Sequence, residues 1–179
     1  MTQAVFASPT EKNVRVLVAE NKKTLHVTVQ GAYQIRLLPS LQVVKMGEHL
    51  VSAVLIPVPN GVKLGLDTWV CQGIIIEPAR DRDLYLDRSR FRGFVRILKD
   101  KNNFLYAINY VDLESYLYGV LHHEVASWWP MEALKAQAIT ARTYALYQAG
   151  VSRNAEFELK SGTGSQVYGG STTERYRSK

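Results

Sequence analysis

The sequence lacks several features that would each define a class of protein. It has a single cysteine, Cys71, which excludes an internal disulfide framework and any multi-cysteine zinc site. No uninterrupted apolar stretch approaches the roughly 20 residues of a membrane-spanning helix. The best candidate, residues 50–62, is interrupted by Pro57, Pro59 and Gly61. With 12 glycines, 6 prolines and 46% hydrophobic residues among 179, the chain is neither fibrous nor disordered, and its length suits one sizeable domain.

The chain has an excess of positive charge that is unevenly distributed. It carries 22 basic and 16 acidic residues, a formal net charge of +6, and residues 111–179 contain seven of each sign. The whole surplus therefore lies in residues 1–110, partly in the run 80–101. A basic protein can bind nucleic acid, an anionic membrane or an acidic polymer such as a cell-wall glycan. In residues 80–83 the charges alternate in sign, which favours paired, solvated surface strands, so we expect no nucleic-acid partner.

Residues 13–110 predict short β-strands. Residues 25–30 alternate between apolar and polar side chains, the pattern of a strand with one buried face. Five further segments have a similar composition, at residues 14–19, 33–38, 41–46, 93–98 and 104–109. Turn-forming residues separate them at 20–23, 59–61 and 100–103.

From residue 111 the apolar residues recur at helical spacing. Asp112 is a predicted helix N-cap, and the apolar positions 113, 117, 120 and 121 follow it at intervals of three and four. A second helix is predicted at 131–148, with Pro130 at its first position, Glu132 in its first turn and Gly150 at its end.

These patterns predict an α+β fold built as one domain over residues 13–179. It comprises a β-rich part at 13–110, a helical segment with two main helices at 111–150 and a loop-rich tail at 151–179. Residues 1–12 are expected to be disordered or processed.

Glu124 is the most informative charged residue of the first predicted helix. It lies one step beyond the apolar stripe of Leu113, Leu117 and Val120, so a helix that persists this far would turn it toward the buried side. Burial would raise the pKa of its carboxyl, as a general acid near neutral pH requires. Alternatively, the helix ends earlier and Glu124 is a capping or salt-bridging residue.

The second predicted helix places two cations beside a stripe of small residues. Lys135 and Arg142 are seven residues apart and therefore share one side of the helix. Leu134, Ala138, Ala141 and Ala145 form the adjacent packing stripe. The two cations could orient a carboxylate or hold an anionic substrate group, or they could simply be solvated.

Other candidate features have weaker functional interpretations. Trp128 and Trp129 could stack on a sugar ring, although an aromatic residue before a helix more often packs into the core. His122 and His123 would point about 100° apart on a helix and cannot easily share an ion. The segment 162–165 lacks the lysine of a phosphate loop and predicts a flexible turn. We expect no metal and no cofactor.

Several segments occur in the order of a known family. They are VDLESYLYGV at 111–120, His123-Glu124, Trp129-Pro130 and EALKAQAITARTYA at 132–145, with FRG at 91–93 upstream and SQVY at 165–168 downstream. This pattern, which covers most of residues 13–170, closely resembles the SpoIID/LytB domain family.

The resemblance implies a peptidoglycan lytic transglycosylase. Such enzymes cleave the bond between N-acetylmuramic acid and N-acetylglucosamine without water, because the muramyl 6-hydroxyl attacks and leaves an anhydro-sugar end. Family members prefer denuded strands, from which a partner amidase has removed the stem peptides. By resemblance, Glu124 is the catalytic acid and base, Lys135 and Arg142 position Glu124 or the sugar, and Gln166 and Tyr168 line the groove. The implied location is the cell envelope, periplasmic or extracytoplasmic, although no intact signal peptide is visible.

The sequence also departs from the family pattern. Many relatives have Glu-Met preceded by a small residue, whereas this chain has His123-Glu124-Val125. The cysteine and histidine metal ligands of some members have no counterpart at 159–165, so no zinc site is carried over. Family domains continue well beyond Gln-Val-Tyr, so we expect a domain truncated at its C-terminus. These departures favour the alternative, a non-catalytic peptidoglycan-binding module that recruits or stimulates an N-acetylmuramoyl-L-alanine amidase. A basic nucleic-acid-binding protein is a third reading, without a groove-reading motif to support it.

Overall fold

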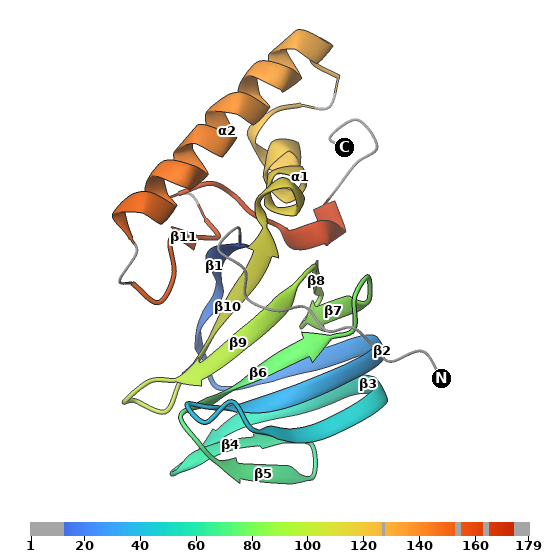
Figure 1. Cartoon of the computed structure of the whole chain (residues 1–179), viewed down its shortest axis with the longest axis vertical. Helices are drawn as coiled ribbons and strands as arrows, with labels where there is room; N and C mark the ends of the chain where they lie inside the picture. Colours follow the sequence, from blue (N-terminus) through green and yellow to red (C-terminus); the bar gives the residue numbers. More distant parts are fainter. Residues whose placement is uncertain (1–12, 127, 153–154, 163–164, 174–179) are drawn as a thin grey trace.

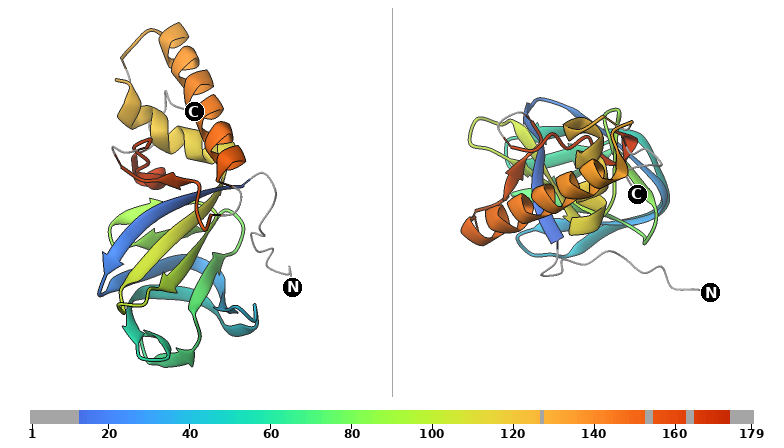
Figure 2. Two further views of the ribbon diagram at one scale, coloured as in Figure 1. Left: turned by 90° about the vertical axis from the view of Figure 1, so that its left-hand side faces the viewer. Right: turned by 90° about the horizontal axis from the view of Figure 1, so that it is seen from above.

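The strands and helices occupy opposite ends of the molecule. The computed structural model describes residues 13–126, 128–152, 155–162 and 165–173, so the expectation for residues 1–12 lies outside the described residues. Figures 1 and 2 show the two helices stacked at one end of the strands. The elements are β1 (Asn13–Lys22), β2 (Leu25–Leu38), β3 (Val43–Val58), β4 (Gly61–Leu64), β5 (Asp67–Val70), β6 (Gly73–Pro78), β7 (Asp83–Leu86), β8 (Ser89–Phe91), β9 (Phe94–Lys99), β10 (Leu105–Asp112), α1 (Leu113–Glu124), α2 (Met131–Val151), β11 (Leu159–Lys160) and the 3₁₀ helix η1 (Gly170–Thr173).

The strands form one mainly antiparallel sheet. Within the described residues its order is β11-β1-β10-β9-β6-β2-β3-β4-β5, and β7 pairs with both β2 and β8. Among the described strands, only the short β11 runs parallel to its neighbour β1. The β-rich first part and the two following helices confirm the predicted α+β class.

One hydrophobic core joins the sheet to the helices. Inward-facing strand residues such as Val16, Ile35 and Ile97 are fully buried, and Tyr116 of α1 and Ala141 of α2 belong to the same cluster. Burying this apolar surface is the main favourable contribution to folding. The helices are therefore packed as part of the core that the strands build.

Strand boundaries differ from the prediction where backbone geometry intervenes. The two segments predicted at 25–30 and 33–38 form the single strand β2, which passes through Gly31 at φ 120°. The strand predicted from residue 41 begins at Val43, because Leu41 adopts φ 59° in the preceding turn. Residues 80–82, expected in paired surface strands, instead form the turn between β6 and β7, with Asp81 at φ 61°.

Both helices form close to their predicted bounds. The carboxylate of Asp112 caps α1 by accepting the N–H of Ser115 at 3.0 Å. Pro130 caps α2 instead of occupying its first turn, and α2 continues one residue past Gly150. Three of the four residues of the predicted packing stripe are buried in α2, namely Leu134, Ala141 and Ala145, whereas Ala138 is only half-buried. Neither helix, nor any other in the described part of the chain, is long and apolar enough to cross a membrane.

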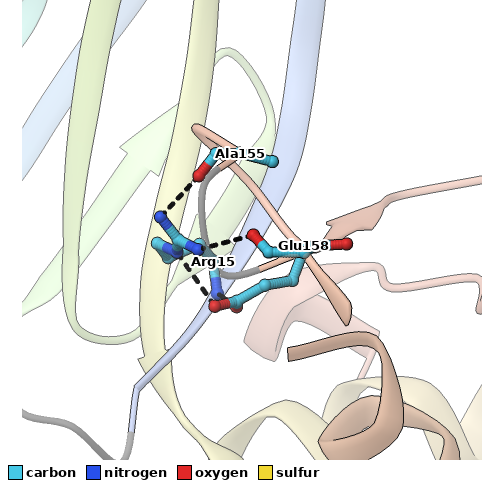
Figure 3. Close-up of polar contacts among 4 residues, drawn as sticks. Arg15, Ala155 and Glu158 are labelled. Atoms are coloured by element: carbon cyan, nitrogen blue, oxygen red, sulfur yellow. Dashed lines mark hydrogen bonds and ion pairs between the residues drawn. The ribbon is translucent and has the colours of Figure 1, made fainter. Parts of the chain in front are cut away.

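Arg15 of β1 ties the end of α2 to the sheet (Figure 3). Its Nε donates to Glu158 Oε1 at 2.9 Å, and its backbone N–H donates to the other carboxylate oxygen at 2.6 Å. The guanidinium also donates to the carbonyls of Ala155 at 2.7 Å and Ser152 at 3.3 Å. Because Ser152 is the C-cap of α2, this one side chain links the end of the helix and the following tail to β1.

Candidate functional site

Glu124 is the last residue of α1 and contacts the tail of the chain. Its Oε1 accepts the backbone N–H of Val167 at 3.1 Å. Within the described residues this is the carboxylate's one hydrogen bond, and the side chain is exposed. The structure therefore brings Glu124 to the Gln-Val-Tyr segment, 43 residues further along the chain, and leaves Oε2 without a hydrogen bond among the described residues.

The predicted burial of Glu124 is wrong. The helix does persist to Glu124, and Leu117, Val120 and Leu121 of the same stripe are buried. The next residue, Val125, leaves the helix in an extended conformation with φ −140° and buries its own side chain. The inward position at the end of the stripe is thus filled by Val125, and the glutamate emerges beside the tail.

Hydrogen bonds between buried side chains hold the tail segment 165–168 against α1 and β10. The hydroxyl of Tyr116 on α1 donates to Gln166 Oε1 at 3.0 Å, and the hydroxyl of Tyr168 donates to Asn109 Oδ1 on β10 at 3.0 Å. Gln166 and Tyr168 are only 8% and 3% exposed. The structure thus places both in the interior, where they hold the backbone that meets Glu124. Their predicted contact with substrate stays a prediction.

Two tyrosine rings and a glycine allow the tail segment to pack closely against α1. The rings of Tyr116 and Tyr168 pack with centroids 5.0 Å apart. A Cβ on Gly119 of α1 would lie 2.6 Å from Tyr168 Cε2 and 2.8 Å from the carbonyl oxygen of Gly170, so only glycine allows the tail this close to the helix. Burial raises the pKa of the Tyr116 hydroxyl, and it also raises the pKa of the Tyr168 hydroxyl. Both groups therefore stay protonated near neutral pH and act as donors.

Arg142 links the two helices. Its guanidinium forms a two-pronged ion pair with Glu114 of α1, with Nε and Nη2 at 3.1 and 2.7 Å from the carboxylate oxygens. This hydrogen bond and the charge of Glu114 raise the pKa of Arg142. Sequence analysis missed Glu114 as a partner, because the two residues are 28 positions apart and only the packing of α1 on α2 brings them together.

Lys135 lies seven residues before Arg142 on the same side of α2, about two turns earlier, and is exposed. Its Nζ donates to Glu132 at 2.8 Å, three residues before it. This spacing is visible in the sequence and would have predicted the pair. In the described part of the chain, neither Lys135 nor Arg142 forms a hydrogen bond or ion pair with Glu124. Their positioning of Glu124 or of a sugar stays a prediction.

The two tryptophans do not pack into the core, so the more common interpretation of them is wrong. Trp128 and Trp129 are 79% and 46% exposed. They lie in the short connection between α1 and α2. Two aromatic surfaces therefore lie within five residues of Glu124.

As far as the structure describes them, the remaining candidates offer no set of metal ligands. Within the described ranges, no group of three His, Cys, Asp or Glu side chains lies close enough to hold a metal ion. His123 is exposed at the end of α1, and the side chain of His122 lies outside the described residues. Gly162 and Ser165 lie in bends, while the two residues between them also lie outside the described residues.

Comparison with curated proteins finds uncharacterized relatives. An uncharacterized protein of Brachyspira hyodysenteriae is 29% identical over 176 residues, which cover 93% of this chain and 45% of the relative. An uncharacterized protein of Chlamydia muridarum is 28% identical over 160 residues, which cover 87% of this chain and 52% of the relative. The chain thus spans about half the length of these curated relatives. No solved structure matches it significantly.

The matched family model covers the segment that forms the site. Residues 101–179 match the model described as SpoIID, stage II sporulation protein. This range contains β10, both helices and the tail, and therefore every residue that meets at Glu124. Residues 101–179 are thus similar to the SpoIID family, and this similarity supports a role related to sporulation or the cell wall.

Proposed function

We propose that this chain is part of a peptidoglycan lytic transglycosylase in which Glu124 is the general acid and base. The observation that carries the proposal is the hydrogen bonding of the two oxygens of its carboxylate. Oε1 is held by the N–H of Val167, while Oε2 of this exposed side chain forms no hydrogen bond with the described residues. One oxygen fixes the orientation of the group, and the other is available to exchange a proton with a bound glycan.

A single carboxylate can complete the reaction. Protonated Glu124 donates its proton to the glycosidic oxygen, and the bond from the muramyl anomeric carbon to that oxygen breaks through an oxocarbenium-like state. The muramyl 6-hydroxyl then forms the new bond to the anomeric carbon and gives its proton to the Glu124 carboxylate. No water is consumed, the acid is regenerated, and the products are an anhydro-muramyl end and a free N-acetylglucosamine end.

The surroundings of Glu124 suit the carboxylate stage of this cycle. The carboxylate carries a negative charge between the two proton transfers, and the N–H of Val167 stabilises that charge by a hydrogen bond. Arg142 holds α1, which carries Glu124, against α2 through Glu114. Lys135, on the same side of α2, is a candidate contact for the anionic groups of the strand.

The natural substrate of this proposal is a denuded glycan strand. A partner amidase would supply it by removing stem peptides, and the reaction would take place in the cell envelope, where peptidoglycan lies. The exposed Trp128 and Trp129 offer ring faces on which sugars stack.

The test is product analysis with the full-length protein. Purified denuded glycan strands are incubated with it, and anhydro-muramyl ends are measured by mass spectrometry. Glu124→Gln should lower the rate by about 10²–10⁴-fold, the usual contribution of a general acid or base. Glu48→Gln, a change at an exposed glutamate of β3, is the matched control and should leave the rate unchanged. Absence of anhydro products from the folded protein, or full activity of Glu124→Gln, would refute the proposal.

A second candidate function is a glycan-binding module that recruits or stimulates an amidase. The exposed tryptophans favour it as much as they favour catalysis, because they offer binding surface without chemistry. This function is identified by glycan binding without turnover, together with faster release of stem peptides by the amidase when the protein is added.

A further inference from the structure

A polar cleft lies at the opposite end of α1 from Glu124. Its volume is about 500 Å³, within the size range of about 300–1,000 Å³ that is usual for ligand sites. Its walls come from the turn between β6 and β7, the connection from β8 to β9 and the first turn of α1. The basic run singled out in the sequence contributes the three basic residues of the lining: Arg80, Arg82 and Arg92.

Two of the arginines are uncommitted. Within the described residues, the side chains of Arg80 and Arg82 form no ion pair or hydrogen bond, and both residues are exposed. Two of the lining aspartates are already engaged, because Asp112 caps α1 and Asp83 lies 3.6 Å from Arg90. The cleft therefore presents two guanidinium groups that have no partner among the described residues. Two of the three carboxylates beside them already have partners within the protein.

The stem of Arg82 packs against the backbone of a neighbouring strand. Its stem lies across Gly31 of β2, where a Cβ would be 2.7 Å from Arg82 Cδ. Gly31 has φ 120°, a conformation that L side chains rarely adopt. Holding the stem in place lowers the entropy that the guanidinium loses when it binds a ligand.

We propose that this cleft binds a saccharide carrying a carboxylate. Arginine matches a carboxylate with two parallel hydrogen bonds, and Asp81 and Ser115 can bind sugar hydroxyls. Three arginines face three aspartates along the walls, a balance that disfavours a densely charged polyanion. No aromatic ring belongs to the described lining, so the platform on which nucleobases stack is missing.

If the proposed function holds, the ligand is the denuded strand itself. Removal of a stem peptide exposes the lactyl carboxylate of each muramyl unit, and a neutral chitin strand has no such group. Asp112 and Glu124, which bound α1, are 12 residues apart, or about 18 Å along the helix. The cleft is therefore a distal subsite that selects denuded strands, and it contributes to substrate binding more than to the chemical step.

The experiment compares three probes by calorimetry with the full-length protein. They are a denuded muramyl oligosaccharide, a chitin oligosaccharide of equal length and poly(glycerol phosphate). The protein should bind the muramyl probe more tightly than the chitin probe. The double variant Arg80→Ala/Arg82→Ala should lose about tenfold or more in affinity for the muramyl probe, as expected when charged hydrogen bonds are removed. Its affinity for chitin should not change.

Two further variants sharpen the result. Arg88→Ala removes an exposed arginine of the β7–β8 turn, outside the cleft, and should bind like the wild type. Arg80→Lys/Arg82→Lys keeps the charge but not the two-pronged geometry, and its affinity should lie between wild type and the alanine variant. Unchanged muramyl affinity in the alanine variant, or equally tight binding of poly(glycerol phosphate), would overturn the assignment.

The two proposals can fail independently. Loss of turnover in Glu124→Gln with unchanged binding in Arg80→Ala/Arg82→Ala would support the transglycosylase and reject the cleft. Weaker binding in the double variant of a protein that forms no anhydro products would do the reverse.

Discussion

At the scale of single residues, the contact between α1 and the tail depends on what is absent at position 119. A hydrogen in place of a side chain lets Tyr168 and Gly170 approach the helix, and Tyr168 then reaches Asn109. The same close approach brings Gln166 under Tyr116 and Val167 to Glu124. The geometry of the candidate site is therefore set by buried neighbours of Glu124.

Gly119→Ala should destabilise the protein by about 1–3 kcal/mol, the usual cost of overpacking, because the new methyl group meets backbone and a confined ring. Gly150→Ala is the matched control in α2. A Cβ there meets nothing within 4 Å, and alanine is the better helix former, so this variant should be as stable as wild type or up to about 1 kcal/mol more stable. Chemical denaturation measures both, and equal stabilities would contradict the packing described here.

Tyr116→Phe should leave Gln166 Oε1 buried without its donor, at a cost of about 1–3 kcal/mol. With segment 165–168 less firmly held, the rate of glycan cleavage at saturating substrate should fall more than substrate affinity does. Tyr118→Phe changes a partly buried tyrosine of the same helix and should leave the rate unchanged. A purely structural role for Tyr116 would lower stability but not the rate of the folded enzyme.

At the scale of elements, α2 is held to the sheet at its C-terminal end. There Arg15 binds the cap residue Ser152 and the following tail. Glu158, the partner of Arg15, has a side chain only 8% exposed. A buried carboxylate that loses its cation costs far more than a surface ion pair is worth.

Arg15→Ala should therefore lower the free energy of unfolding by about 2–4 kcal/mol, since Glu158 and two carbonyls lose their donor. Lys160→Ala is the comparison, because it breaks the exposed pair between β11 and Glu20 of β1, whose side chains are both more than half exposed. Its expected cost is below about 1 kcal/mol. Thermal and chemical unfolding of the two variants would measure this difference. Equally small losses of stability in both variants would argue against a stabilising role for the Arg15 hydrogen bonds in Figure 3.

The sequence predicted features that depend on local interactions, and it did not predict features that depend on contacts between distant segments. The cap at Asp112 and the stripe of Leu134, Ala141 and Ala145 were predictable, because capping and helical periodicity are local. The exposure of Glu124 was not, since it depends on Val125 turning inward after the helix ends. Pairs such as Arg142 with Glu114 depend on how distant segments pack and carry no local signal.

At the scale of the whole molecule, a carboxyl group buried within the sheet makes the free energy of unfolding depend on pH. Glu77 of β6 is 1% exposed and lies opposite Gln34 of β2, whose amide donates to it. Arg36 Nε is 3.1 Å from the same carboxylate. Burial raises the pKa of Glu77 above its ordinary value of 4.5, although Gln34 and Arg36 act in the opposite direction.

A raised pKa in the folded state means that folding favours the protonated carboxyl. As pH falls through the folded pKa toward 4.5, the folded chain takes up more proton than the unfolded chain, and Glu77 contributes stability that is absent at higher pH. The difference in unfolding free energy between wild type and Glu77→Gln should therefore shift in favour of wild type as the pH is lowered from 7 to 5. The loss of the Arg36 partner adds a constant offset, so the slope alone reports the titration of Glu77. Glu48→Gln, at an exposed position of β3, should run parallel to wild type over the same range, and a parallel curve for Glu77→Gln would show that burial does not shift this carboxyl.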